Sequence, residues 1–230
     1  NAGFDTEKAI NAAVRTSQNS WYEGLGSYID FGFVTEDKSG SSVSKTLEYA
    51  YDDWAIAQMA KKLDKSDIYE EYFKRSQNFS NVFDKESCFM RPRSSDGKFI
   101  EPFDELDTHA KGFIEGNSWN YSLYVPHNVD SLIELLGGNE KFEIYLDSIF
   151  TMHLPDKYFE DTEDITRDGI IGNYVHGNEP SHHVPYLYNW TSSPWKTQKT
   201  IRMISEKMYR PTTDGLGGND DLGQMSAWYI

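Results

Sequence analysis

Apolar residues recur along most of this chain at the three- and four-residue spacing of an α-helix. In residues 5–19 the apolar face is formed by Ile10, Ala13 and Val14, with Ser17 one turn further on. Positions three and four apart lie on one side of a helix, so this spacing predicts a first helix.

The strongest helical pattern covers residues 42–63, which contain neither proline nor glycine. The hydroxyls of Ser42 and Ser44 can cap its N-terminus. Its predicted apolar stripe is Ile56, Met59, Ala60 and Leu63. Another helix is predicted to begin at Ser66-Asp67 and to bury the stripe Tyr69, Tyr72, Phe73, Ser76, Phe79 and Phe83.

Two stretches in the first half lack this spacing. Residues 21–40 are rich in glycine and aromatic residues and are predicted to form a loop. Residues 94–97 read Ser-Ser-Asp-Gly and lie between two short apolar pairs, Phe89-Met90 and Phe99-Ile100. A turn sequence between apolar pairs predicts a short hairpin.

The second half alternates between helices and irregular segments. Residues 119–136 are predicted to be helical, interrupted by Pro126 and stopped by Gly137-Gly138, because proline and glycine disrupt helices. Further helices are predicted at 139–150, capped by Asn139, and at 184–190, 194–209 and 222–230, with an irregular segment at 152–178.

The expected fold class is therefore all-α, with about eight helices, almost no strand and no repeat of fixed period. Consecutive helix pairs joined by long loops are typical of a helical toroid, in which loops at one end build the site. The chain stops inside an apolar run, Trp228-Tyr229-Ile230, from which we expect it to be a piece of something longer.

Composition narrows the possible partners. The 230 residues carry a net charge of -15, from 37 acidic against 22 basic residues, which disfavours nucleic acid and anionic membranes. None of the apolar segments approaches the roughly 20 residues that a membrane span needs, so no membrane insertion is expected. Aromatic residues make up 15% of the chain, which suits sugar binding, although most such rings belong to protein cores. Cys88 is the single cysteine, which excludes an intrachain disulfide and a thiolate metal cluster.

The densest chemistry lies in the turn His176–His183, which reads HGNEPSHH. Its histidines and Glu179 are the residue types of a zinc site, but the glycine and proline break the helix that would align them. Carboxylate and carbonyl oxygens from a turn suit calcium instead. A plain helix cap with surface histidines is the third interpretation.

Two acidic turns flanked by glycine accompany it, and we expect all three to meet in one site. Glu115 precedes a helix and two aromatic residues, so it is either a cap or a general acid whose pKa the aromatic setting raises. Asp220-Asp221 follow Gly217-Gly218 and are either an N-cap pair or one half of a catalytic set. An acid and a second carboxylate across a cleft are what glycoside hydrolysis needs.

Five segments in order together resemble the calcium-dependent α-mannosidases of glycoside hydrolase family 92. They are Ser42–Trp54 (SVSKTLEYAYDDW), Glu115–Trp119 (EGNSW) with Val125–His127 (VPH), His176–His183 (HGNEPSHH), Pro194–Gln198 (PWKTQ) and Asp214–Trp228 (DGLGGNDDLGQMSAW). The resemblance runs nearly end to end. It implies that residues 1–230 are part of an (α/α)6 toroid, with the early helices and a preceding β-sandwich domain absent.

The same resemblance implies an inverting, exo-acting α-mannosidase, most often acting on α-1,2-linked mannose in N-glycans or mannans, and a secreted, periplasmic or cell-surface location. Glu115 resembles the general acid. Asp221 is the first choice for the base and Asp220 the second, since Asn219 here replaces an acid that some members carry. Glu179 matches a position at the calcium, while Asn178, His182 and His183 share its motif and Trp119 that of the acid, as sugar-binding candidates.

Calcium suits this chemistry because an ion that chelates the 2- and 3-hydroxyls of mannose can hold the ring distorted toward the oxocarbenium geometry. Inversion requires room for a water, so the two carboxyl groups should lie about 6.5–9.5 Å apart. Two alternatives remain: a non-catalytic carbohydrate-binding helical domain, and an inactive fragment of such an enzyme.

Overall fold

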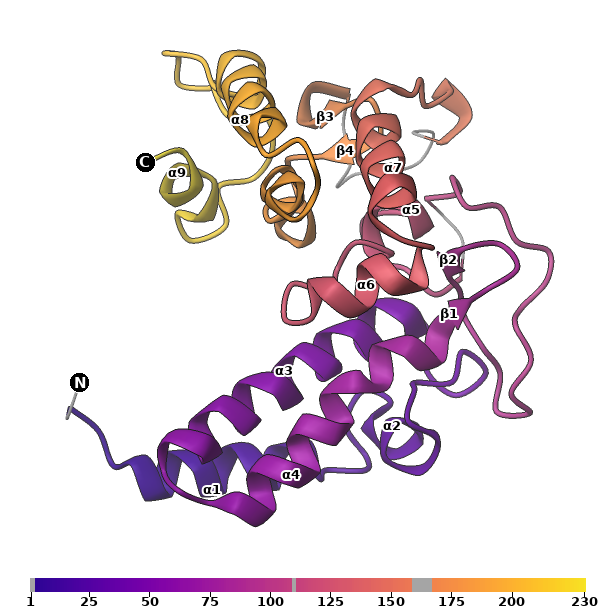
Figure 1. Ribbon diagram of the computed structural model, residues 1–230, viewed down its shortest axis with the longest axis vertical. Coiled ribbons are helices and arrows are strands. Elements are labelled where there is room, and N and C mark those ends of the chain that lie inside the picture. The colour runs from indigo at the N-terminus through magenta and orange to yellow at the C-terminus, as the bar shows by residue number, and fades with distance from the viewer. Residues whose placement is uncertain (1–2, 109–110, 159–166) are drawn as a thin grey trace. The chain divides into compact units, whose positions relative to one another are not determined.

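The computed structural model describes residues 3–108, 111–158 and 167–230 and is rich in helix (Figure 1). It contains two compact units. We call residues 1–84 and 90–102 the N-terminal unit, and residues 85–89 and 103–230 the C-terminal unit. The helix-rich content confirms the predicted class, whereas the toroid stays a prediction.

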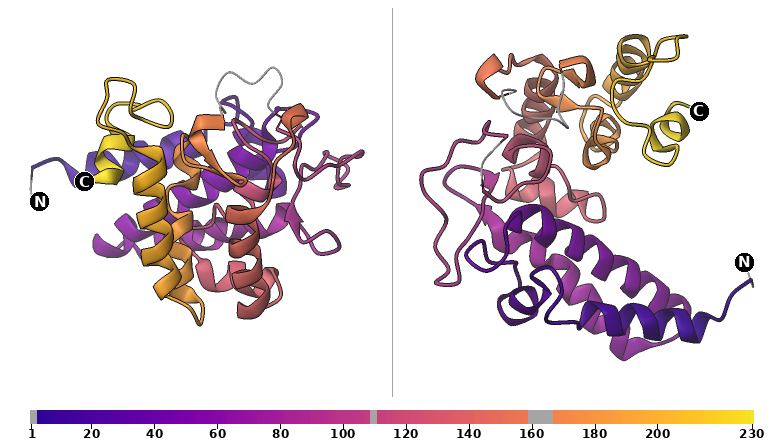
Figure 2. Two further views of the ribbon diagram at one scale, coloured as in Figure 1. Left: turned by 90° about the horizontal axis from the view of Figure 1, so that it is seen from above. Right: turned by 180° about the vertical axis from the view of Figure 1, so that it is seen from behind.

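The N-terminal unit is built on α1, α3 and α4, and α3 packs against both of the other helices (Figure 1; Figure 2, right). Asp5 caps α1, its carboxylate accepting from the Lys8 amide at 3.0 Å. The elements are α1 (Thr6–Ser17), α2 (Leu25–Phe31), α3 (Ser42–Lys62), α4 (Ser66–Arg75), its 3-10 continuation η1 (Ser76–Val82) and β1 (Phe83–Asp84). The buried core includes Ile10, Leu47, Ala50, Tyr72, Phe79 and Val82.

The predicted loop at 21–40 is wrong in part, because it contains α2. This helix has seven residues and is bounded by Gly24 and Gly32, both in the left-handed conformation. Two glycines so close together hide a short helix from a periodicity argument, since fewer than two turns are available to show the spacing.

The span predicted for α3 is confirmed, but only Ala60 of its predicted apolar stripe is fully buried. Ala57 and Ala60 are fully buried, while Ile56 is half-buried, because small residues let α3 approach its neighbours closely. The predicted serine caps are also wrong: the Ser42 amide donates to the Glu36 carboxylate at 3.2 Å.

In α4 and η1, the predicted stripe is confirmed for Tyr72, Ser76 and Phe79, which are buried, but Phe73 is 45% exposed. The predicted turn at 94–97 is confirmed by the Gly97 amide bonding the Ser94 carbonyl at 2.9 Å, and Phe99 bridges Arg93. The pair Phe89-Met90 instead forms β2, which joins β1 in a two-stranded sheet.

The C-terminal unit packs α6, α7, η5 and α8 against one another. Its elements are α5 (Ser118–Tyr121), α6 (Val129–Leu135), α7 (Asn139–Thr151), η2 (Asp156–Tyr158), η3 (Arg167–Gly169), β3 (Ile170–Ile171), β4 (Tyr174–Val175), η4 (Glu179–Ser181), η5 (Val184–Trp190), α8 (Trp195–Met208) and α9 (Gln224–Tyr229). Its core includes Leu123, Leu132, Phe142, Leu146, Ile149, Tyr174 and Ile204.

The predicted breakers act as expected. Pro126 lies between α5 and α6, and Gly137 and Gly138 end α6 with positive φ angles of 91° and 103°. The cap of α7 differs from the prediction, because Gly138 occupies the N-cap position and Asn139 begins the helix.

The segment predicted to be irregular, 152–178, contains a small hairpin. β3 pairs antiparallel with β4, Ile170 opposite Val175 and Ile171 opposite Tyr174. Its turn is Gly172-Asn173, where Gly172 has φ of 67° and a Cβ would meet the Ile149 carbonyl at 2.6 Å. Residues 159–166 of that prediction lie outside the described part of the chain.

Among the residues that the structure describes, none of the helices has both the length and the apolar character that a membrane crossing requires.

Candidate active site

The structure brings the three motif turns together within the C-terminal unit. In chain order, the first turn carries Glu115, the second is His176–His183 and the third carries Asp220 and Asp221. The Asn178 amide donates to the backbone carbonyl of Glu115 at 2.9 Å, which joins the first two turns. A Cβ on Gly218 would lie 2.4 Å from the Cα of Gly177, so the second and third turns touch backbone to backbone. The expectation that the three turns meet is confirmed.

Glu115 lies on a turn whose helix is capped by another residue. Asn117 is the N-cap of α5, and it forms a reciprocal capping box with Asn120. The Tyr121 hydroxyl donates to the Ile114 carbonyl at 2.6 Å. Glu115 itself is exposed and has a φ of 51°, a left-handed conformation that costs a non-glycine residue energy. The residue that caps α5 by hydrogen bonds is therefore Asn117 and not Glu115.

A buried pair of asparagines anchors this turn to the β3–β4 hairpin. The Asn117 Nδ2 donates to Asn173 Oδ1 at 3.0 Å, and the Asn173 Nδ2 donates back at 3.3 Å. Asn120 adds a bond to the Asn173 carbonyl at 2.6 Å. Sequence reasoning missed Asn173, although Gly-Asn between two apolar pairs is a hairpin signal that could have found it.

The two aspartates of the third turn have different surroundings. The Asp220 carboxylate accepts from the Ser226 amide at 2.9 Å and from its hydroxyl at 3.0 Å, which caps the first turn of α9. Asp221 is exposed, and within the described residues its carboxylate makes no hydrogen bond or ion pair. Its φ is 39°, and Leu222 and Gly223 follow at 59° and 92°.

His176 is fully buried between two tyrosines. Its Nε2 lies 2.8 Å from the Tyr209 hydroxyl, which donates to the Met225 carbonyl at 3.0 Å. His176 Nε2 is therefore the donor to Tyr209, and its Nδ1 accepts from the Tyr174 hydroxyl at 2.8 Å. Burial lowers the pKa of His176 to about 3, so the imidazole is neutral.

The other two histidines also serve the fold. His182 Nε2 donates to the His176 carbonyl at 2.9 Å, and His183 Nε2 to the Leu123 carbonyl at 2.7 Å. Burial lowers both pKa values, that of His183 to about 4. In the described part of the chain, the buried His182 Nδ1 is left without a hydrogen-bond partner.

This arrangement disfavours the zinc interpretation. Both nitrogens of His176 bond tyrosines, and the described residues contain no group of three His, Cys, Asp or Glu side chains placed to hold a metal. Glu179 is half-buried, and among the described residues its carboxylate has no hydrogen-bond or ion-pair partner. One such carboxylate, next to the amide of Asn178, fits an oxygen-ligated ion that takes its remaining ligands from carbonyls and water.

Trp119 belongs to an aromatic cluster. Its ring lies 4.4 Å from that of Tyr145 and 5.1 Å from that of Phe89, measured between centroids, and its carbonyl accepts from the Tyr145 hydroxyl at 3.0 Å. Trp119 belongs to α5, the helix that follows Glu115, and its ring packs in this aromatic cluster of the C-terminal unit.

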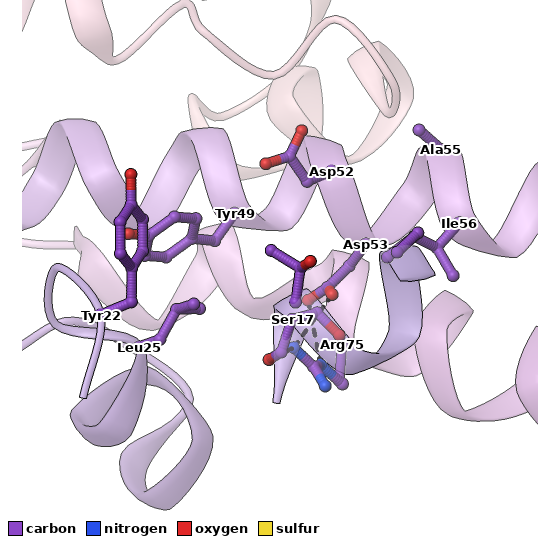
Figure 3. Close-up of a pocket in the computed structure, with 11 residues that line it drawn as sticks. Ser17, Tyr22, Leu25, Tyr49, Asp52, Asp53, Ala55, Ile56 and Arg75 are labelled. Carbon is purple, nitrogen blue, oxygen red and sulfur yellow. Dashed lines mark hydrogen bonds and ion pairs between the residues drawn. The ribbon is translucent and has the colours of Figure 1, made fainter. Parts of the chain in front are cut away.

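A separate pocket of about 380 Å³ lies within the N-terminal unit (Figure 3). Tyr22 and Tyr49 line it, together with Asp52 and an ion pair of Asp53 with Arg75. The pocket contains none of the predicted site residues.

A family model described as the glycosyl hydrolase family 92 catalytic domain matches residues 1–230. A family GH92 α-mannosidase from Bacteroides thetaiotaomicron, solved in complex with mannoimidazole, is 46% identical with a TM-score of 0.91, covering 99% of this chain and 30% of that one. A family GH92 inverting mannosidase from the same organism is 33% identical with a TM-score of 0.84, covering 99% and 32%.

A curated relative from Arthroderma benhamiae, named an uncharacterized secreted glycosidase, is 28% identical over 223 residues. That match covers 87% of this chain and 26% of the relative. The chain therefore spans about a quarter to a third of the length of these relatives.

Proposed function

The chain belongs to glycosyl hydrolase family 92, and on that premise we propose that it supplies the acid, the base and an ion-binding turn of an α-mannosidase. Because it spans 30% of a similar α-mannosidase, we propose that the complete enzyme is longer. Residues 1–230 then form part of one (α/α)6 toroid, and the segments that complete the sugar pocket lie elsewhere in that enzyme.

The observation that carries this proposal is that, in both acidic turns, the residue that caps a helix and the residue with the exposed carboxylate are different. Asn117 and Asp220 do the helix capping, whereas Glu115 and Asp221 are exposed on left-handed backbone. Residues on strained backbone cluster at active sites, and here two such residues carry exposed carboxylates.

In the proposed reaction the substrate is a terminal, α-1,2-linked mannose of a glycan. Protonated Glu115 donates its proton to the glycosidic oxygen as the bond to the anomeric carbon breaks. Asp221 takes a proton from a water that attacks the opposite face of the anomeric carbon. The products are β-mannose and the rest of the glycan with a free hydroxyl, and they leave Glu115 ionised and Asp221 protonated. The carboxyl groups should lie about 6.5–9.5 Å apart to admit that water.

We further propose that Glu179 is a calcium ligand, with Asn178 beside it. A bound calcium would polarise sugar hydroxyls and favour a distorted ring. Among the described residues, the buried Nδ1 of His182 has no hydrogen-bond partner, and His182 is kept, with His183 and Trp119, as a sugar-binding candidate. The curated relative is named a secreted glycosidase, which supports a location outside the cytoplasm or on the cell surface for this protein.

Replacement Glu115→Gln tests the acid with two substrates. Hydrolysis of α-1,2-mannobiose should fall by about 10²–10⁴-fold. Hydrolysis of a dinitrophenyl α-mannoside should fall much less, because that leaving group needs no proton. Asp221→Asn should slow both. Glu134→Gln, an exposed glutamate on α6, is the matched control. Equal losses on both substrates for Glu115→Gln would remove Glu115 from the acid role.

The alternatives are tested on the same proteins. A carbohydrate-binding module would bind mannobiose with no turnover in the 230-residue chain or in the longer protein. Equal turnover by the two proteins would contradict the proposal that the pocket needs further segments. For the ion, activity lost to a chelator should return with calcium; return with zinc alone would favour the histidines.

A further inference from the structure

Tyr209, the residue after α8, contacts both ends of the turn that carries Asp221. Its backbone bridges Leu216, and the adjacent Gly217 amide donates to the Met208 carbonyl at 3.0 Å. These contacts hold the beginning of the turn against the end of α8.

The Tyr209 hydroxyl holds the other end. It accepts from His176 at 2.8 Å and donates to the Met225 carbonyl in α9 at 3.0 Å. Burial raises the pKa of Tyr209 to about 12, so the hydroxyl keeps its proton and can make both bonds at neutral pH.

The ring of Tyr209 adds a third set of contacts. It lies parallel to Trp228, with centroids 6.1 Å apart, and 4.6 Å from the ring of Tyr229. Trp228 in turn donates from its indole nitrogen to the His182 carbonyl at 3.0 Å. Tyr209 therefore ties α9 to the turn that contains Glu179.

Between these anchors, residues 221–223 have three consecutive positive φ angles. Such strained backbone persists only where its surroundings over-determine it. We propose that Tyr209 is the positioning residue that holds Asp221 in its working conformation, acting through its hydroxyl bonds to His176 and Met225. This inference rests on the proposed role of Asp221 as the base.

The test is Tyr209→Phe, which removes the hydroxyl and keeps the ring. In the longer protein we expect kcat on α-1,2-mannobiose to fall about 10- to 100-fold with little change in KM, since a misplacement of about 1 Å can cost about 100-fold. The matched control is Tyr174→Phe, which removes the other buried hydroxyl on His176 and should leave kcat within twofold. Equal kcat for wild type and Tyr209→Phe would overturn the inference.

Two further measurements separate this inference from the proposed function. If Tyr209 acts through the base, Tyr209→Phe should cause no further loss in an Asp221→Asn background, whereas a multiplied loss would refute action through Asp221. Hydrogen exchange needs no activity: the amides of Gly217, Gly223 and Gln224 should exchange faster in Tyr209→Phe and not in Tyr174→Phe. Unchanged exchange overturns the positioning role, while full activity of Asp221→Asn overturns the base.

Discussion

Adding one methyl group at Gly218 should displace the turn that carries Asp221, the proposed base. An alanine Cβ there would lie 2.4 Å from the Cα and 2.9 Å from the carbonyl oxygen of Gly177. Carbon atoms in contact are about 3.5–4.0 Å apart, so the two turns must separate by about 1 Å. The φ angle of Gly218 is not positive, so its backbone conformation is otherwise compatible with alanine.

The expected result of Gly218→Ala follows from that distance. A displacement of about 1 Å at Asp221, three residues away, should lower kcat on a mannoside by about 100-fold. Overpacking should also cost about 1–3 kcal/mol of stability. Both are measured on purified longer protein, by initial rates well below the melting temperature and by thermal unfolding.

The control is Gly40→Ala, where the nearest atom to a new Cβ is the Glu36 carboxylate oxygen at 4.0 Å. This variant should keep the rate and the melting temperature of the wild type. A folded Gly218→Ala with kcat within twofold of wild type would show that contact between the two turns does not govern the position of Asp221.

Three other predictions concern stability. Arg75→Met strands Asp53, whose carboxylate Arg75 contacts at 3.1 and 3.0 Å; it should cost about 3–5 kcal/mol at pH 8. Burial raises the pKa of Asp53 to about 6, so at pH 5 the carboxyl is protonated and urea unfolding should show a smaller loss; equal losses would contradict this. Asn173→Ala unpairs a buried amide and should cost about 1–3 kcal/mol in thermal unfolding, an unchanged melting temperature counting against the anchor. Burial lowers the pKa of His183 from 6.5 to about 4, so its contribution to stability is present above pH 6.5 and is lost as the pH falls toward 4. The loss should amount to about 1.4 kcal/mol for each unit by which the pKa is lowered. In acid titrations of stability His183→Gln should flatten this slope, and an unchanged slope would exclude His183 as its source.

Local pattern was a good guide where the deciding interactions are local. The spans of α1 and α3, the interruption at Pro126 and the stop at Gly137-Gly138 follow from side-chain spacing and backbone chemistry within a few residues. The same reasoning failed at α2 and at the β3–β4 hairpin, because neither is long enough to display a period.

The candidate site divides in the same way. The sequence by itself determined the candidates for the chemistry: Glu115, Asp221 and Glu179 are visible as residue types in three glycine-flanked turns. The capping box of Asn117, three residues from its partner, was equally accessible in principle, since it is local.

The tertiary structure alone decided which of the polar groups in these turns have hydrogen-bond partners. Asn178 reaches Glu115 across 63 residues of chain, and His176 reaches Tyr209 across 33. Such partners depend on how helices pack, which no short-range pattern encodes. For that reason the sequence could name three conspicuous histidines as candidates, while only the fold revealed that burial keeps them neutral and that their bonds hold the turns in place.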